Sequence, residues 1–227
     1  GWSLKHMHRL VLNSRAWRQA SRRTSDRAEE IDPGNTLLWR QNLNRLESEI
    51  IRDAVLAVSG RLNPKAFGPP VSVTSPVSGL SMVEPGPSGN GHNRRSVYIF
   101  ARRVYPLKFM EIFDSPIMAV NCTRRMNSTT VLQSFAQLNS DFVVHAAKDT
   151  GDRLLKAAGT NKSNFITLAW QTVVGRRPTD DEHQACEQFL AEQTATWRQT
   201  NPAEARQLAM ADLCHMLLCT NEFIHVE

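Results

Sequence analysis

The chain has 227 residues, a formal net charge of +5 and 41% hydrophobic residues, a composition typical of a globular protein rather than a disordered one. A chain of this length can bury a substantial core, in one large domain or two small ones. It contains no run of eighteen apolar residues, which excludes a transmembrane segment within it.

The first helix is predicted over residues 3–20, where leucine, methionine, valine and tryptophan recur near helical spacing. Its polar face is basic, as in helices that lie on membranes, but we interpret it as the cut end of a core element. The chain opens on Gly1 already inside this pattern. We therefore expect a fragment whose upstream domains are missing, so that the absence of a signal peptide says nothing about its compartment.

The clearest helix is predicted over residues 36–60, with Asn35 as its N-cap. In this helix Glu49 lies about one turn from both Arg45 and Arg52. Ion pairs on the helix surface are the default interpretation of such spacing. A functional cluster of carboxylates is the alternative.

Residues 62–93 have loop composition, because they hold six of the eleven prolines and five of the eleven glycines. A loop of this length inside a domain is usually functional or disordered. The sequence Ser-Val-Tyr-Ile-Phe at 96–100 is the best strand candidate, as one arm of a small pairing. Pro106 and Pro116 follow, so we expect irregular structure over 101–127.

The rest of the chain is predicted to be helical. Thr130 and Gln133 have the spacing of a capping box, which opens a helix with Leu132, Phe135 and Leu138 directed inward. Similar signals predict four more helices, the first over 141–158. Ser163 or Asn164 caps the second, which ends at Gly175. A second capping box at 179–182 opens the third, and Asn201 with Pro202 opens the last.

These elements predict a mainly α fold. We expect an antiparallel helical assembly that carries a Pro/Gly-rich irregular insert and a short β-strand pair. The chain is interpreted as a single domain fragment, with N-terminal helices in 1–61, a loop-rich basic insert in 62–127 and a C-terminal helical part in 128–227.

No catalytic motif is found. There is no G-x-S-x-G or H-E-x-x-H sequence, and the seven histidines lack metal-ligand spacing, so no metal is predicted. The cysteines form no C-x-x-C pair and no C-x-x-C-H haem attachment site, so we expect no cofactor in this fragment. Buried thiols are the favoured interpretation and one disulfide the alternative for an exported protein; the four are Cys122, Cys186, Cys214 and Cys219.

The stretch 94–139 carries the net charge of the chain. It holds seven basic and two acidic residues, and seven minus two is +5. Arginine grips carboxylate or phosphate with a planar fork and stacks on aromatic rings. Together with the acidic helix before it, the stretch predicts a polar, anion-binding cluster of Arg45, Glu49, Arg52, Asp53, Arg94, Arg95, Tyr98, Arg124 and Arg125.

Two interpretations of this cluster stay open. The arginines with interleaved aromatics suit single-stranded nucleic acid, although no nucleic-acid motif accompanies them. An anionic glycan, or the carboxylates of a neighbouring domain, suits the same groups equally well. Alternatively, the arginines pair internally and lock the irregular segment onto the long helix, since buried arginine is kept only when it is paired. Their partners would be Glu47, Glu49, Asp53 and Asp114.

The ordered motifs resemble a bacterial, planctomycete-type family catalogued as domain of unknown function 1553. They begin with G-W-S-L-K-H-M-H-R-L at 1–10 and extend over essentially the whole chain. Further matching motifs are W-R-Q at 17–19, N-T-L-L-W-R at 35–40, R-L-E-S-E-I-I-R-D-A at 45–54, V-S-G-R-L-N at 58–63, R-R-S-V-Y at 94–98, F-D-S-P at 113–116, C-T-R-R-M-N-S-T-T-V-L-Q at 122–133, L-N-S-D-F-V at 138–143, G-R-R-P-T-D-D-E at 175–182 and N-E-F-I-H-V-E at 221–227. His225 departs from the pattern, which has an aromatic residue, usually tyrosine, at that position.

The resemblance implies the C-terminal part of a large exported protein, periplasmic or at the cell surface. Upstream domains of the same polypeptide, often with a c-type cytochrome domain, would be its partners, and any haem would belong to them. No catalytic residue carries over. We therefore hold three hypotheses: a scaffold or interaction domain, part of a polysaccharide-acting enzyme whose site is shared with the upstream domain, and a binder of polyanions or nucleic acid.

Overall fold

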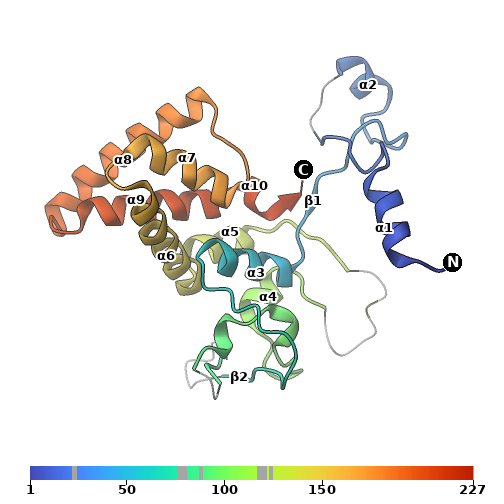
Figure 1. Ribbon diagram of the computed structural model, residues 1–227, viewed down its shortest axis with the longest axis horizontal. Helices are drawn as coiled ribbons and strands as arrows, with labels where there is room; N and C mark the ends of the chain where they lie inside the picture. The colour runs from blue at the N-terminus through green and yellow to red at the C-terminus, as the bar shows by residue number, and fades with distance from the viewer. Residues whose placement is uncertain (22–24, 76–80, 87–88, 117–121, 123–124, 227) are drawn as a thin grey trace. The chain divides into compact units, whose positions relative to one another are not determined.

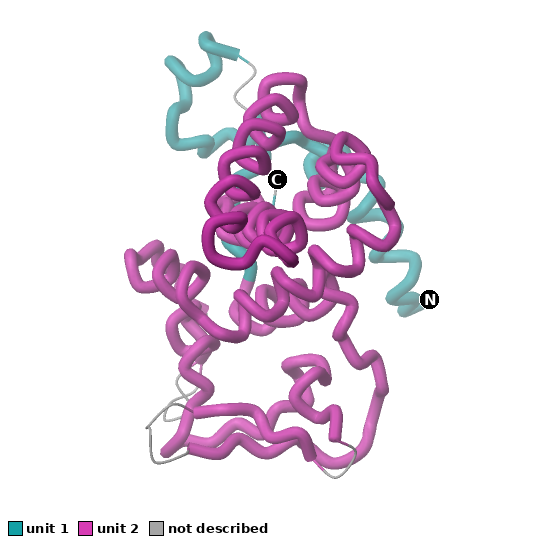
Figure 2. Tube along the Cα trace, turned by 90° about the vertical axis from the view of Figure 1, so that its left-hand side faces the viewer, with its two compact units in different colours: residues 1–46, 224–227 teal, residues 47–223 magenta. Residues whose placement is uncertain are grey.

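A computed structural model describes residues 1–21, 25–75, 81–86, 89–116, 122 and 125–226. The chain divides into two compact units, shown in two colours in Figure 2. The first unit is formed by residues 1–46 together with the C-terminal residues from Ile224, and the second by Glu47–Phe223.

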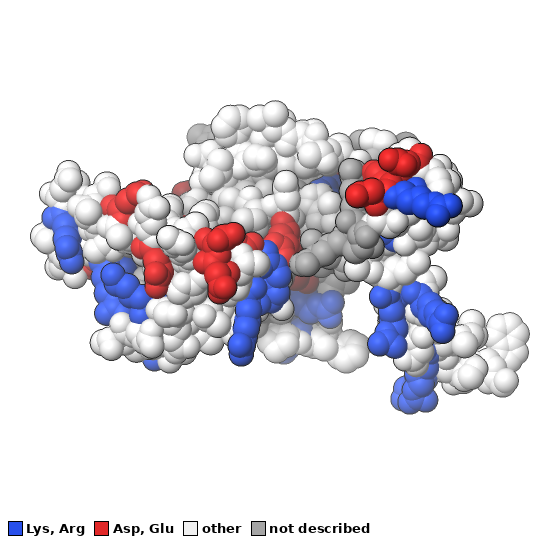
Figure 3. Space-filling view, turned by 90° about the horizontal axis from the view of Figure 1, so that it is seen from above, with Lys and Arg blue, Asp and Glu red and all other residues white. Residues whose placement is uncertain are grey.

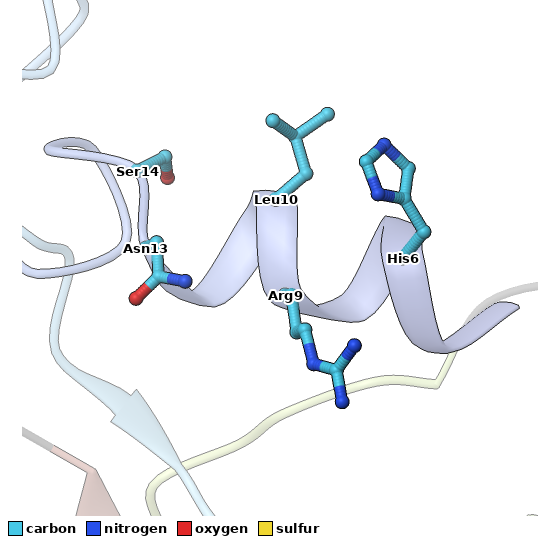
Figure 4. Close-up of a pocket in the computed structure, with 5 residues that line it drawn as sticks. All are labelled: His6, Arg9, Leu10, Asn13 and Ser14. Atoms are coloured by element: carbon cyan, nitrogen blue, oxygen red, sulfur yellow. The ribbon is translucent and has the colours of Figure 1, made fainter.

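The first unit holds α1 (Leu4–Leu12), α2 (Asp26–Ile31) and a short antiparallel pair of β1 (Asn44–Arg45) with β4 (His225–Val226). Its first helix is shorter than the predicted 3–20, because Asn13 already forms its C-cap. A pocket-like hollow of about 370 Å³ lies along α1, open on the helix surface. Figure 4 shows the lining side chains His6 and Leu10 pointing to one side of α1 and Arg9 pointing to the other.

The predicted helix over 36–60 is wrong in its first half. Asn35 and Leu38 have positive φ angles of 54° and 56°, which an α-helix cannot contain. The Asn35 side chain brackets a loop instead of capping a helix, since its Nδ2 donates to the carbonyl of Arg40 over 2.7 Å and its Oδ1 accepts from the Arg40 N–H over 3.2 Å. The helix itself, α3, begins only at Ser48 and ends at Val58.

The main core of the second unit lies among four helices, α6 (Asp141–Ala158), α7 (Lys162–Val173), α8 (Asp180–Thr200) and α9 (Ala205–Leu218) (Figure 1). They bury large apolar side chains almost completely, among them Phe165, Ile166, Leu190, Leu213 and Leu217. Gly151 lets α6 approach α9, because a Cβ at this position would lie only 3.1 Å from the Cα of Ala211. Short α10 (Asn221–Ile224) follows α9.

The capping boxes that the sequence predicts are confirmed. Thr130 and Gln133 open α5 (Val131–Asn139), and Thr179 and Glu182 open α8. The helix over 141–158 is confirmed as α6. Two starts differ: Asn161 caps α7 in place of Ser163 or Asn164, and α9 begins at Ala205, three residues beyond Pro202.

The insert contains the predicted short strand pair, but from other residues. β2 (Val73–Thr74) pairs antiparallel with β3 (Met82–Val83). The expected strand at 96–100 is a 3-10 helix, η2 (Ser96–Tyr98), and only Ile99 makes a bridge, to Val71. The reason is local: both the N–H and the hydroxyl of Ser96 donate to Asp53, which turns the chain away from a ladder. Another 3-10 helix, η1, covers Gly91–Asn93.

Residues 117–121, 123 and 124 of the segment expected to be irregular, 101–127, lie outside the described residues. In the rest of that segment the expectation is wrong where α4 (Lys108–Ile112) forms. An aromatic cluster accounts for it. The ring of Phe109 lies 5.1 Å from that of the buried Phe113 and 5.3 Å from that of Phe142 on α6. The fold class is nevertheless confirmed: the protein is mainly helical with small antiparallel strand pairs.

The prediction for α5 is wrong in orientation. Leu132, Phe135 and Leu138, which were expected to face inward, are exposed. The buried residues of this helix are Gln133 and Gln137. Their amides donate to the main-chain carbonyls of Ile112 and Leu218, and these hydrogen bonds decide which face of α5 turns to the core.

Candidate functional site

Arg52 on α3 is the centre of the predicted cluster. It is 3% exposed, and its guanidinium donates to the carbonyl of Arg94 over 3.0 Å and to the hydroxyl of Ser96 over 3.2 Å. It also donates to the carbonyl of His92. All three acceptors belong to the segment 92–96, so one α3 side chain fixes the path of η1 and η2.

Burial lowers the pKa of Arg52 to about 10, although the charge of neighbouring Asp53 acts in the opposite direction. At neutral pH the guanidinium is therefore still charged. A buried cation is tolerated only where hydrogen-bond acceptors surround it, and the 92–96 segment supplies them. The guanidinium of Arg52 thus holds the 92–96 loop in place, and the hydrogen bonds described for it all go to that loop.

Asp53 complements Arg52 from the next position of α3. One carboxylate oxygen accepts from both the N–H and the hydroxyl of Ser96, each over 2.7 Å. Arg95 and Arg52 lie near the same carboxylate, at 3.6 Å and 3.8 Å. Asp53 thus satisfies donors at the start of η2.

Arg94 fastens a different loop. Its guanidinium donates to the carbonyls of Pro69 over 2.9 Å, of Phe67 over 2.7 Å and of Lys65 over 3.4 Å. It also lies over the ring of Tyr98 at 4.0 Å from the centroid, a cation–π arrangement. The hydroxyl of Tyr98 accepts from the N–H of Phe67 over 2.9 Å, so both side chains hold the 65–69 loop.

Arg125 and Glu49 form a second group at the start of α3. Their two hydrogen bonds, of 2.6 Å and 3.1 Å, are the bidentate fork of arginine on carboxylate, and Glu47 lies 3.3 Å away. Burial tends to raise the pKa of Glu49, but the bonds from Arg125 and neighbouring donors outweigh it, so this pKa is lowered overall. Glu49 is therefore a carboxylate at neutral pH.

The structure thus divides the predicted cluster. It brings Arg52, Asp53, Arg94, Arg95 and Tyr98 together, while Glu49 and Arg125 make a separate pair. Arg45 belongs to the other compact unit, on β1 rather than on a helix, and Arg124 lies outside the described residues. Asp114, a predicted partner, accepts from the N–H and hydroxyl of Ser128 over 2.8 Å.

A further charged network was not predicted. The guanidinium of Arg176 donates two hydrogen bonds to the carboxylate of Glu182 and two to that of Glu222, over 2.6 to 2.9 Å. It also lies 4.6 Å from the ring centroid of Trp170. The hydrogen bonds from Arg176 lower the pKa of Glu182 to about 2. The G-R-R-P-T-D-D-E motif contains two of these residues, but Glu222 lies too far along the chain for any local signal.

Ser163, His183 and Glu187 give the arrangement closest to a nucleophilic site. The hydroxyl of Ser163 lies 2.9 Å from Nε2 of His183, but Glu187 is 3.8 Å from Nδ1, beyond hydrogen-bond reach. Ser163 and Glu187 are exposed. A working triad needs the acid to orient the imidazole, and this geometry does not provide it.

The described part of the chain contains no metal-binding group, and burial disfavours the thiolate at its buried cysteines. No three His, Cys, Asp or Glu side chains there lie close enough to hold a metal ion. All four cysteines are free thiols, but the expected burial is confirmed only for Cys186 and Cys214, since Cys219 is half-buried and Cys122 is exposed. Burial raises the pKa of Cys214 to about 12 and that of Cys219 to about 11, against the reactive thiolate. No helix over the described ranges has the length and apolar character needed to cross a bilayer.

Figure 3 shows basic and acidic side chains beside one another at several places on the face it presents, and other basic side chains that have no acidic neighbour in this view. In comparisons with known proteins, no curated protein and no solved structure matches the chain. A family model does match it over residues 1–190, well over half of its length. The chain therefore belongs to the PSD1 family, described as a protein of unknown function (DUF1553).

Proposed function

We propose that this chain is a non-catalytic scaffold and interaction domain, the C-terminal part of a large exported bacterial protein associated with c-type cytochrome domains. The observation that supports the proposal is how the charged cluster is used. Arg52, Asp53 and Arg94 direct their hydrogen bonds to loop backbone and to Ser96. Groups that do acid–base chemistry lie in a cleft within reach of a substrate, whereas these groups shape the domain.

The test compares the full-length polypeptide with a version that lacks this domain. A scaffold predicts that its removal lowers the thermal midpoint of the upstream domains by several degrees or separates proteins that otherwise purify together. Differential scanning calorimetry and native mass spectrometry measure both effects. Upstream domains that keep their midpoint and their partners after the deletion would contradict the scaffold.

Part of a polysaccharide-acting enzyme, with a site shared with the upstream domain, is the alternative. Glu49 and Asp53 would then be its carboxylates. The alternative predicts glycan cleavage by the full-length protein, lost on Glu49→Gln at unchanged thermal midpoint. Loss of cleavage in Glu49→Gln at an unchanged thermal midpoint would favour the enzyme over the scaffold. A full-length protein that cleaves no polysaccharide in a broad panel would favour the scaffold.

A second candidate function is the binding of an anionic glycan, which one observation favours. Arg102 and Arg103 are exposed beside the exposed rings of Phe100 and Tyr105, and the guanidinium of Arg102 lies 5.7 Å from the ring centroid of Phe100. Arginine and aromatic faces together suit sulfated or carboxylated sugars.

Retention on heparin tests this candidate. A glycan binder elutes earlier as salt rises, and Arg102→Gln with Arg103→Gln shifts elution to lower salt, whereas the matched change at paired Arg125 has less effect. Retention that is insensitive to both changes would exclude this surface. Tighter binding to single-stranded nucleic acid than to glycan would assign this surface to nucleic acid instead.

A further inference from the structure

The helix α1 leaves its apolar side chains in water. Leu4, Met7, Leu10 and Val11 recur at helical spacing on one side of it, and between 46% and 74% of each is exposed. No residue of α1 is buried. We call these four residues the α1 stripe. Scattered apolar residues are ordinary on a protein surface, whereas a continuous stripe along one helix marks a surface that binds something apolar.

The other side of α1 is cationic. Lys5 and Arg9 lie one turn apart and away from the α1 stripe. Figure 4 shows Arg9 and Leu10 pointing to opposite sides of the helix. Residues 1–25 hold six Lys or Arg and no Asp or Glu. Within the part of the chain that the structure describes, no salt bridge involves the four cations at Lys5, Arg9, Arg15 and Arg18.

The cations of this segment differ from those of the charged cluster in the second unit. There, Arg52 and Arg94 donate to main-chain carbonyls, and Arg125 is paired with Glu49. Such arginines are neutralised or surrounded by acceptors inside the domain. The positive charge of α1 is not balanced in this way over the described ranges, so it attracts negative charge from outside.

A partner of α1 must satisfy both sides of the helix at once. The surface of an acidic protein would cover either the α1 stripe or the cations opposite it, and would leave the other side in water. A bilayer interface that contains anionic lipid meets both. A helix that lies along it sinks about 5–10 Å, with apolar side chains against the acyl chains and basic ones among the phosphate groups. The exposed indole rings of Trp2 and Trp17 suit the same layer.

We propose that α1 binds the surface of a membrane that contains anionic lipid, in place of the core element expected from the sequence. The helix lies in the plane of the interface, because its nine residues span only about 14 Å of the roughly 30 Å hydrocarbon core. So short a stripe binds weakly by itself. Attraction to anionic headgroups adds about fivefold in affinity for each Lys or Arg near the surface. The contact is therefore reversible and weakens as salt rises.

Flotation of the 227-residue chain with lipid vesicles tests the charge requirement. The chain should float with vesicles of phosphatidylglycerol and phosphatidylcholine in equal parts, and not with vesicles of phosphatidylcholine alone. Lys5→Gln with Arg9→Gln should lower the affinity about 25-fold. The matched control, Lys156→Gln with Arg198→Gln, removes the same charge from exposed positions of the second unit and should change the affinity less than about twofold.

Three outcomes of this experiment would overturn the proposal. The first is that the chain does not float with the anionic vesicles. The second is equal flotation with both kinds of vesicle, because anionic lipid would then play no part. The third is an equal loss of affinity in the two double variants, because net charge rather than α1 would then decide binding.

A single substitution tests the α1 stripe. Leu10→Glu should lower the affinity for the anionic vesicles on the order of a hundredfold, because it brings a carboxylate to acyl chains and anionic headgroups. Leu37→Glu is the control, since Leu37 is 74% exposed in the same unit, and should lower it less than about fivefold. Both side chains are largely in water, so both variants should keep the thermal midpoint of the natural chain within about 2 °C.

Unchanged flotation of Leu10→Glu would overturn the proposal, because the basic residues alone would then hold the chain on the vesicles. Self-association of the natural chain without lipid, lost in Leu10→Glu, would also overturn it, since a second copy would then cover the α1 stripe. Sedimentation velocity measures this self-association.

Discussion

Two regions of the second unit are held together by different physics. The helices α6 to α9 enclose side chains such as Phe165 and Leu213 that have no exposed surface. The insert buries only a few apolar side chains, such as Val73 and Phe113, and two arginines, Arg52 and Arg94, donate to main-chain carbonyls of its irregular segments. A Pro/Gly-rich loop has few apolar side chains to bury, so its backbone carbonyls become the groups by which it can be fixed.

This comparison predicts that a change in the helical core unfolds the second unit as a whole. Phe165→Ala should cost about 4 kcal/mol, because it removes a fully buried ring and leaves a cavity. The matched change at an exposed site, Phe135→Ala, should cost less than about 0.5 kcal/mol. Urea unfolding followed by circular dichroism measures both. A similar loss at the two positions would show that the core is not where the structure places it.

Arg52→Met should act on the insert before the helices. It leaves Asp53 without its buried neighbour and the carbonyls of His92 and Arg94 without a donor, a cost of about 3 kcal/mol. Hydrogen exchange should then speed up over residues 91–99 while α6 to α9 keep their protection. Arg95→Met is the control, since Arg95 is largely exposed and its ion pair is worth little. Uniform loss of protection across the second unit would contradict separate stabilisation.

A smaller effect is expected at the 65–69 loop. Arg94→Gln removes the donors to Pro69 and Phe67 and the stacking on Tyr98, a loss of about 1–2 kcal/mol confined to that loop. Limited proteolysis should cut this loop faster in the variant than in Arg102→Gln, where an exposed arginine is changed. Equal cutting in the two variants would mean that Arg94 does not fasten the loop.

The sequence predicts the parts of this fold that local chemistry decides. The capping boxes at Thr130 and Thr179 were readable because both partners lie within four residues. The helix cap predicted at Asn35 is wrong because its side-chain amide donates to the carbonyl of Arg40, five residues later. The predicted orientation of α5 is wrong because Gln133 and Gln137 donate to carbonyls that are distant in the sequence. The charge pattern of the sequence points to Arg52 and Arg94, but most of their acceptors are uncharged backbone carbonyls that no charge pattern reveals.

The smallest effect is expected in the network of Arg176. Its guanidinium packs over the ring of Trp170 and donates hydrogen bonds to the carboxylates of Glu182 and Glu222. The hydrogen bonds from Arg176 hold the pKa of Glu182 at about 2, below its unfolded value of 4.5. A depressed folded pKa gives stability that is present above pH 4.5 and is lost as pH falls toward 2. Partial exposure to solvent reduces this contribution to about 1 kcal/mol. Urea unfolding between pH 6 and pH 2 should therefore show that the free energy of unfolding falls more steeply with acid in the natural chain than in Glu182→Gln. The Arg176–Glu222 pair is unchanged in this variant. Parallel curves would mean that the bond from Arg176 does not stabilise the carboxylate of Glu182.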